Sequence, residues 1–319
     1  MVTVEGEIVE IGGAHLDAAG YDLLGVICGS EGMLGIVTEA TLRILAAPEG
    51  ARPVLMGFDS SETAGACVAD IIKSGVIPVA IEFMDKPCIH ATEAHAGAGY
   101  PMDVEALLIV EVEGSEPEIA EQLARIREVA DRHAPMVVRE STSDEESAAI
   151  WLGRKSAFGA MGQLGDYICL DGTVPVARLP EVLRRTGELA AEYGLRVANV
   201  FHAGDGNMHP LILFDANTPG QLETAEALGA ELLKVCVEAG GCLSGEHGVG
   251  VEKRDLMHHQ YGAADLEQQM AVKDAFDPGW LLNPAKVFPL DASASRGPAL
   301  AEEVDADTRE RGGTRRGGG

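Results

Sequence analysis

The segment V-F-H-A-G-D-G-N-M-H-P, residues 200–210, is the most informative part of this 319-residue chain. Branched and apolar residues lie on both sides of Gly204–Asn207, whose composition is typical of a tight turn between two strands. If the turn is centred on the middle of that sequence, His202 and His209 face each other across it with their Cβ atoms about 5 Å apart. We therefore expect the two imidazoles to lie close enough to bind one metal ion. The alternative is a polar turn flanked by two unrelated histidines.

A second short motif, G-E-H-G at residues 245–248, adds a carboxylate and a third imidazole. Two His side chains and one Glu are a common site for a catalytic divalent ion, because they leave coordination positions open for substrate. We predict that His202, His209 and Glu246 bind the metal. Zinc is our first choice, and the same ligands accept manganese or iron. His247 is then free to act as a base, since an unperturbed imidazole titrates near neutrality.

Residues 142–161 predict an amphipathic helix that begins with a capping box and carries one charge on its apolar side. Arg154 lies on the same stripe as Trp151, Phe158 and Met161. A guanidinium at this position must find an anionic partner or extend to water, because an unpaired buried charge is very unfavourable. Its planar group also suits a bidentate bond to a carboxylate.

Strands and helices alternate along the middle of the chain with short connections. This order favours an α+β fold in which helices pack on an antiparallel sheet, with a parallel α/β arrangement as the alternative. The predicted strands are 54–58, 76–83, 106–112, 167–174 and 195–201. The predicted helices are 61–73, 88–96, 116–132, 144–161 and 179–193, with further helices from residue 218 onward.

The two ends of the chain differ from this middle part. Alternating apolar and polar residues predict a small hairpin at 3–11, and branched residues predict a strand at 35–45, with a turn-rich connection at 20–32 between them. Residues 290–319 are rich in Ala, Gly, Arg, Glu and Asp without apolar periodicity, so they bury too little surface to offset the entropy of ordering. We predict a disordered tail there.

Composition and charge exclude several classes of function. The formal net charge of -27 repels phosphate backbones and anionic headgroups, so we expect neither nucleic acid nor a lipid surface as a partner. The six cysteines form no C-x-x-C pair, which argues against a disulfide framework and against an iron–sulfur cluster in this chain. No apolar run approaches the roughly 18 residues of a transmembrane segment, and the acidic start is unlike a signal peptide, so we expect a cytoplasmic protein.

Three motifs resemble one family of flavoproteins. They are H-A-G-D-G-N-M-H-P-L-I-L-F-D at 202–215, S-G-E-H-G-V-G at 244–250 and F-D-P-G-W-L-L-N-P-A-K at 276–286. All three are similar to the D-subunit family of bacterial glycolate oxidases, which belongs to the vanillyl-alcohol-oxidase (PCMH) type and is related to D-lactate and D-2-hydroxyglutarate dehydrogenases. The resemblance runs from about residue 1 to 289. It implies the carboxy-terminal part of an FAD-binding domain at 1–50, an α+β substrate and metal domain at 51–289 and the tail at 290–319.

The resemblance also implies roles for single residues. It makes His202, His209 and Glu246 the metal ligands, His247 the catalytic base and Arg154 the anchor of the substrate carboxylate.

On the flavin side, the sequences at 29–38 and 283–286 resemble the two segments that contact FAD in this family. The implied cofactor-binding residues are Ser30, Glu31, Gly32, Gly35, Ile36 and Asn283. In the family, an upstream half of the FAD domain supplies the loop for the pyrophosphate, and this chain begins after that point. We therefore expect the isolated chain to bind metal but little flavin.

Three further positions bear on substrate size. Phe158, Cys169 and Leu211 stand where the D-2-hydroxyglutarate dehydrogenases carry polar or charged side chains. A pocket without such groups cannot pair with a second carboxylate, which favours a small substrate such as glycolate or D-lactate. Core packing is the alternative for Phe158 and Leu211.

Together these features predict oxidation of a small 2-hydroxy acid to the 2-oxo acid, with glycolate favoured and hydride transfer to FAD. A D-lactate dehydrogenase of the same family is the first alternative, and a flavin-free accessory subunit is the second. A metallohydrolase also fits the set of metal ligands, but it leaves unexplained the segments at 29–38 and 283–286 that resemble FAD-contacting segments. The expected partners are a second flavin-domain subunit and an iron–sulfur subunit, through which the protein would attach to a membrane.

Overall fold

The computed structural model describes residues 1–15, 20–293 and 296, which form two compact units. One unit is Met1–Leu45 with His247–Gly319, and the other is Ala46–Glu246. The predicted boundary at residue 50 falls close to the first division. Residues 247–289, expected in the substrate and metal domain, group instead with the amino-terminal segment. Most of the predicted tail, 294–295 and 297–319, lies outside the described residues.

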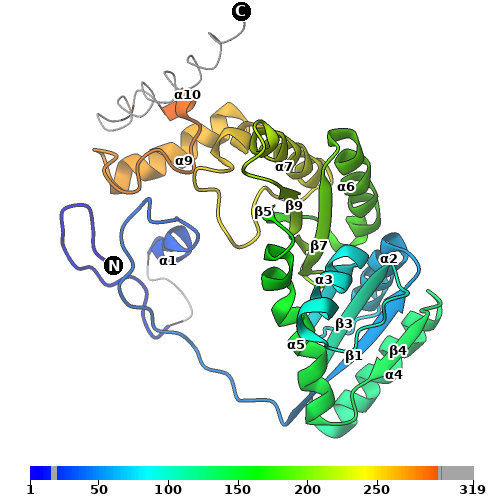
Figure 1. Cartoon of the computed structure of the whole chain (residues 1–319). Helices are drawn as coiled ribbons and strands as arrows, with labels where there is room; N and C mark the ends of the chain where they lie inside the picture. The colour runs from blue at the N-terminus through cyan, green and yellow to red at the C-terminus, as the bar shows by residue number, and fades with distance from the viewer. Residues whose placement is uncertain (16–19, 294–295, 297–319) are drawn as a thin grey trace, which may run out of the picture. The chain divides into compact units, whose positions relative to one another are not determined.

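The unit Ala46–Glu246 is built on a nine-stranded sheet in which the paired strands run antiparallel (Figure 1). This confirms the α+β prediction and makes the parallel alternative wrong. The strands are β1 (Gly50–Phe58), β2 (Ala80–Asp85), β3 (Ala106–Gly114), β4 (Val137–Glu140), β5 (Asp166–Cys169), β6 (Gly172–Thr173), β7 (Arg196–His202), β8 (Asn207–Met208) and β9 (Pro210–Phe214). Their order is β4-β1-β3-β2-β7-β8-β6, and β9 pairs with both β7 and β5.

Helices cover both faces of this sheet. They are α2 (Ser61–Lys73), α3 (Lys86–Ala96), α4 (Glu116–Asp131), α5 (Asp144–Gly162), α6 (Leu179–Tyr193) and α7 (Gln221–Glu238), with the short turn η1 (Val176–Arg178) before α6. Because strand side chains alternate between faces, Met56 packs in one core with α2, α4 and α6, whereas Leu55 packs in the other with α3 and α5. The sheet therefore lies between two buried apolar layers.

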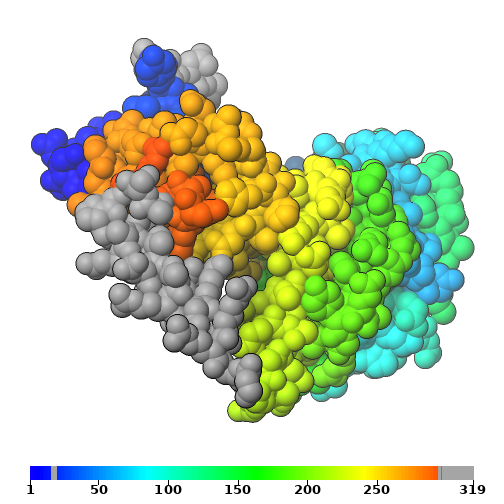
Figure 2. Space-filling view, turned by 90° about the horizontal axis from the view of Figure 1, so that it is seen from above, coloured from blue at the N-terminus to red at the C-terminus, as the bar shows by residue number. Residues whose placement is uncertain are grey.

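A third, smaller core joins α6 and α7. Leu189 of α6 packs with Leu228 and Leu232 of α7 and with Ile212 of β9. The outer sides of the two helices lie next to each other on the face seen in Figure 2. This packing holds the carboxy-terminal end of the larger unit, which leads to the motif at 245–248.

The smaller unit contains short elements. They are α1 (Leu23–Ile27), η2 (Arg254–Leu256), α8 (Met257–Gln260), α9 (Ala263–Phe276) and α10 (Leu290–Ser293). The predicted hairpin is confirmed by the pairing of Val2 with Ile8. The predicted strand at 35–45 is wrong: Ile36 forms one bridge to Val2, and residues 37–45 form no strand. Alternation makes a strand only where a neighbouring backbone completes the ladder. The predicted tail also begins too early, since α10 is helical.

Three strand regions in the larger unit differ from the predictions. The strand predicted at 76–83 begins at residue 80, because Pro78 has no N–H for the ladder. The strand predicted at 167–174 is interrupted by Leu170 and Asp171, which separate β5 from β6. Strand β4 was not predicted, since it is a short strand at the sheet edge. Among the described helices, none is long and apolar enough to cross a membrane.

Candidate metal and substrate site

The two histidines of the 200–210 segment lie close together, through a different register from the predicted one. The turn contains four residues, Ala203–Gly206, and His202 pairs with Asn207 instead of His209. The same register continues where Asn199 pairs with Pro210. His209 is thus diagonal to His202 on the same face of the sheet, because it stands across from the residue two positions before His202. The two ring centroids are 5.5 Å apart.

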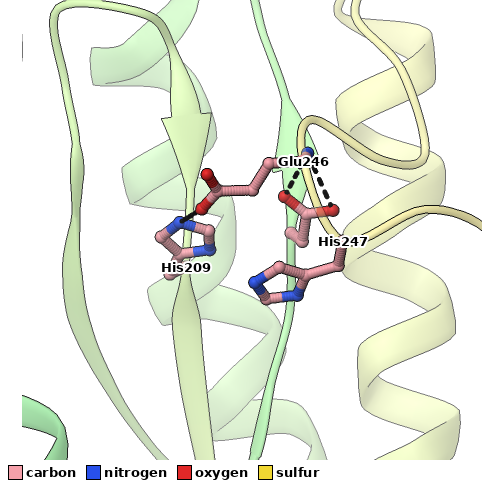
Figure 3. Close-up of side chains that lie close together, drawn as sticks. His209, Glu246 and His247 are labelled. Atoms are coloured by element: carbon pink, nitrogen blue, oxygen red, sulfur yellow. Dashed lines mark hydrogen bonds and ion pairs between the residues drawn. The ribbon is translucent and has the colours of Figure 1, made fainter. Parts of the chain in front are cut away.

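Glu246 brings its carboxylate to these rings. Its Oε1 lies 3.0 Å from Nε2 of His209 and 4.0 Å from Nε2 of His202. Figure 3 shows Glu246 extending from its loop toward the ring of His209. The structure therefore brings together all three predicted metal ligands.

Each of the two imidazoles is oriented by a hydrogen bond at its other nitrogen. His209 donates from Nδ1 to the carbonyl oxygen of Leu170 at 2.9 Å, and His202 donates from Nδ1 to Oε1 of Glu82 at 2.9 Å. In the neutral rings this leaves both Nε2 atoms as acceptors on the side of Glu246. The bond to Glu82 raises the pKa of His202, and burial lowers the pKa of His209.

The loop that carries Glu246 is held by Asp171, which the sequence analysis missed. Asp171 is fully buried and accepts hydrogen bonds from the hydroxyl of Ser244 and from the backbone N–H groups of Gly245 and Glu246. The Asp-Gly pair at 171–172 was the available signal, because that pair is typical of a turn and unusual inside a strand. Its role depends on residues more than 70 positions later in the chain.

A group of four side chains in this region has the composition of a metal site. One ligand atom from each of Asp171, His209, Glu246 and His247 lies within 4.8 Å of the others. His247 is joined to Glu246 by a peptide bond and is the first residue of the smaller unit. Figure 3 draws its imidazole with His209 and Glu246. His202 is outside this group.

These residues fit a divalent ion by their donor chemistry. Two imidazole Nε2 atoms and a carboxylate face one another, and the opposite nitrogens bond to a carboxylate and a carbonyl group, as is usual for metal-binding histidines. Nitrogen and oxygen donors of this kind suit zinc, manganese and iron.

Arg154 has the anionic partner that its place on the apolar side of the helix requires. Its Nε and Nη2 lie 2.9 and 2.8 Å from Oε2 of Glu82, and both side chains are buried. Glu82 was not identified from the sequence. Its signal was one acidic residue within an apolar strand, since a buried charge needs a partner.

The three positions related to substrate size have different surroundings. The ring of Phe158 lies 5.8 Å from the Arg154 guanidinium and 6.4 Å from the His209 ring, so it belongs to the site. Leu211 is fully buried in the core shared with α3 and α5, which supports the packing alternative for this residue. Cys169 is half-buried and pairs with Leu211 along β5 and β9.

In the smaller unit, Glu31 and Asn283 make hydrogen bonds that hold the loop at 29–38, which resembles an FAD-contacting segment of the family. The Glu31 carboxylate accepts N–H groups from Val249 at 2.8 Å and Gly250 at 2.9 Å, and the Asn283 amide donates to the carbonyl of Glu31. These two side chains, predicted to bind cofactor, therefore shape the loop that follows His247.

The other predicted cofactor residues lie along the backbone of the loop at 29–38. Gly32 has φ +73°, and a Cβ at this position would meet no atom within 4 Å, so the space beside it is open. Ser30 accepts at its carbonyl from Met33, and Ile36 pairs with Val2. At Gly35, a Cβ would lie 2.6 Å from the sulfur of Met1. Gly32 therefore leaves room for the edge of a flat ligand such as flavin beside the backbone, whereas Met1 fills the space beside Gly35.

Comparison with known proteins places the chain in a family. Residues 47–287 match the family described as FAD linked oxidases, C-terminal domain. The chain is 48% identical to glycolate oxidase subunit GlcD of Escherichia coli K12 over 90% of its own length and 58% of that protein. It is 30% identical to D-lactate dehydrogenase of Anaerostipes hadrus over 90% of its length and 62% of that protein. It thus spans about three fifths of the length of each of these two relatives.

The fold of the chain is also similar to that of solved structures. A crystal structure of p-cresol methylhydroxylase with substrate bound aligns with a TM-score of 0.57 at 15% identity, over 76% of this chain and 54% of that one. This agrees with the PCMH-type fold expected from the motifs. On the match of residues 47–287 and on the identity to its relatives, the chain belongs to the FAD-linked oxidases and contains their C-terminal domain.

Proposed function

We propose that the chain supplies the metal and substrate site of an FAD-linked oxidoreductase that converts a small 2-hydroxy acid, preferably glycolate, to the 2-oxo acid. The observation that carries this proposal is the convergence of both Nε2 atoms, of His202 and His209, on the Glu246 carboxylate. The names of the relatives, a glycolate oxidase subunit and a D-lactate dehydrogenase, support the same class of substrate.

In this proposal Arg154 binds the substrate carboxylate. A guanidinium has five N–H groups, and Glu82 accepts from its Nε and Nη2, so further N–H groups remain for an anion. Phe158, next to both Arg154 and His209, limits the space beside the substrate. A short side chain such as that of glycolate or D-lactate fits this arrangement better than a second carboxylate, which would meet an apolar ring.

His247 takes the hydroxyl proton of the substrate. A divalent ion held by His202, His209 and Glu246 would lower the pKa of that hydroxyl, and FAD would supply the acceptor for the α-hydrogen as a hydride. The substrate thereby loses one proton and one hydride and becomes the 2-oxo acid. We assign zinc as the first metal to test, with manganese and iron as alternatives.

On the flavin side, we propose that Ser30, Gly32, Gly35 and Ile36 approach FAD through the loop backbone, and that Glu31 and Asn283 keep that loop in shape. The partners that we propose are a second flavin-domain subunit and an iron–sulfur subunit, in the cytoplasm, with any membrane attachment made by the partners. The naming of the E. coli relative as a subunit of glycolate oxidase supports an assembly of several chains.

Zinc uptake by the full chain tests the metal site. We expect wild-type protein to bind one equivalent, and His209→Ala to weaken binding by more than the roughly 10- to 100-fold that follows loss of an outer partner. His259→Ala is the matched control, because His259 is an exposed histidine that is not one of the three predicted ligands. Competition titration with a chelator gives the affinities. Equal affinity of the His209→Ala and wild-type proteins contradicts the site.

Dye reduction by the chain assembled with its flavin-domain partner tests the reaction. We expect a higher kcat/KM on glycolate than on D-lactate, and loss of dye reduction in His209→Ala. A higher value on D-lactate favours the D-lactate dehydrogenase alternative. Absence of dye reduction with every small 2-hydroxy acid contradicts the proposed function.

A further inference from the structure

Glu82 connects the two parts of the proposed site that bind substrate and metal. It lies on β2, where it is the direct partner of His202 across the β2–β7 ladder. It is only 6% exposed, and Arg154 from α5 is 7% exposed. Because Glu82 and His202 are cross-strand partners, their side chains share one face of the sheet, and it is the face that Arg154 meets.

Each oxygen of the Glu82 carboxylate has a different partner. Oε1 lies 2.9 Å from Nδ1 of His202, whereas Oε2 lies 2.9 Å from Nε and 2.8 Å from Nη2 of Arg154. One buried carboxylate therefore accepts from the substrate-binding arginine and from a metal-binding histidine at the same time.

This arrangement determines which nitrogen of His202 can bind a metal. An ionised carboxylate only accepts hydrogen bonds, so it keeps the proton of His202 on Nδ1 and leaves Nε2, which faces Glu246 at 4.0 Å, as the acceptor. Arg154 bonds to the other oxygen of the same carboxylate, so it fixes the orientation in which Oε1 faces Nδ1 of His202.

We propose that Glu82 is a positioning residue that couples the carboxylate-binding Arg154 to the metal ligand His202, so that the chain assembles its substrate anchor and its metal site as one unit. This inference rests on the proposed function and adds to it a dependence of metal binding on Arg154. A purely structural ion pair gives a different expectation, because it holds the core together without changing the metal affinity of the folded protein.

Zinc affinity of folded variants, measured without substrate, tests the proposal. We expect Glu82→Gln to weaken zinc binding by roughly 10- to 100-fold, the range for a lost outer partner of a metal ligand. We expect Arg154→Met to weaken it as well, although Arg154 is no ligand. The double variant should bind no more weakly than Glu82→Gln alone, since both changes act through the same carboxylate.

Asp85→Asn is the matched control, because Asp85 is a second buried acid on β2 whose partner is Asn199. This variant should bind zinc as the wild-type protein does. Thermal unfolding of every variant identifies those that fold.

The tautomer of His202 gives a readout that needs no change at Glu82. Nitrogen-15 NMR of the metal-free wild-type chain above neutral pH, with His202→Gln for assignment, should show the proton on Nδ1. A proton on Nε2 overturns the proposal.

The affinities separate the two levels of inference. Zinc binding that is normal in wild-type protein and unchanged in folded Glu82→Gln or Arg154→Met overturns the coupling alone. Absence of zinc binding by the wild-type chain contradicts the proposed function and overturns the coupling with it.

Discussion

Single side chains in the candidate site have distinct tasks because their hydrogen bonds differ. His202 and His209 each use Nδ1 within the protein, to Glu82 and to the Leu170 carbonyl, and turn Nε2 toward Glu246. Asp171 contributes by accepting a hydrogen bond from the backbone of the loop that carries Glu246. His247 differs from these residues, since we propose that it accepts the substrate proton and does not bind the metal ion.

Replacement of His247 distinguishes a base from a ligand. We expect His247→Ala to lower turnover of the assembled enzyme by roughly 10²- to 10⁴-fold, the usual loss for an acid or base group, and to leave zinc affinity unchanged. Steady-state kinetics and a chelator competition on the same preparation measure the two effects. A large loss of zinc affinity would make His247 a ligand, as its place in the four-residue group allows. Unchanged turnover would remove it from the mechanism.

The turn between β7 and β8 positions both of the histidines that we propose as metal ligands. Its four residues, Ala203–Gly206, place His202 at the end of one strand and leave His209 between β8 and β9. Gly206 has φ +68°, and a Cβ there would lie 2.0 Å from the carbonyl oxygen of Val174. This close approach explains why the turn requires glycine at that position.

Two glycines of the same turn should respond differently to replacement by alanine. Gly206→Ala combines an unfavourable backbone conformation with a clash, and we expect it to lower the free energy of unfolding by about 1 to 3 kcal/mol and to weaken zinc binding. Gly204→Ala is the matched control, because its Cβ would meet Ile81 at an ordinary 3.4 Å. It should be neutral or stabilise the protein by about 0.4 to 1 kcal/mol. Urea unfolding measures both, and equal behaviour of the two variants would contradict this account of the turn.

In the larger unit, helices cover the sheet on both faces. Some polar side chains of the strands are therefore buried. Asp85 at the start of α3 is one of these: it accepts hydrogen bonds from the backbone and side chain of Asn199 and from the N–H of Cys88. These bonds favour the carboxylate, but burial is the larger influence and raises the pKa of Asp85 to about 7.

The raised pKa of Asp85 predicts a fall in stability between about pH 4 and pH 7, where the folded protein keeps a proton that the unfolded chain has released. Above that range, the ionised and buried Asp85 lowers the free energy of unfolding by the full amount. Relative to wild type, Asp85→Asn should therefore gain stability as the pH rises, on the order of 4 kcal/mol across the range, since the pKa is raised from 3.8 to about 7 and one pKa unit corresponds to 1.36 kcal/mol. Urea unfolding at several pH values measures the difference. A difference that is independent of pH would show that Asp85 stays ionised in the folded protein.

Local patterns were sufficient to predict much of this protein. The bounds of α2 and α6 agree with the predicted ranges at both ends, and the antiparallel α+β fold is confirmed. The motifs at 202–209 and 245–248 identified the histidines and the glutamate that the structure brings together. Helix caps, apolar periodicity and turn residues act between neighbours in the chain, so these features are visible in one dimension.

The tertiary structure was needed for the contacts that orient the site. Glu82 lies 120 positions from His202 and 72 from Arg154, and Asp171 lies 75 from Glu246. Strand order and register create these pairs. The sequence predicted a register in which His202 faces His209, whereas the observed register pairs His202 with Asn207, two positions earlier in the chain. The chemistry of the proposed ligands is thus a local property of the chain, whereas their tautomers and orientation come from hydrogen bonds that form only after the sheet has assembled.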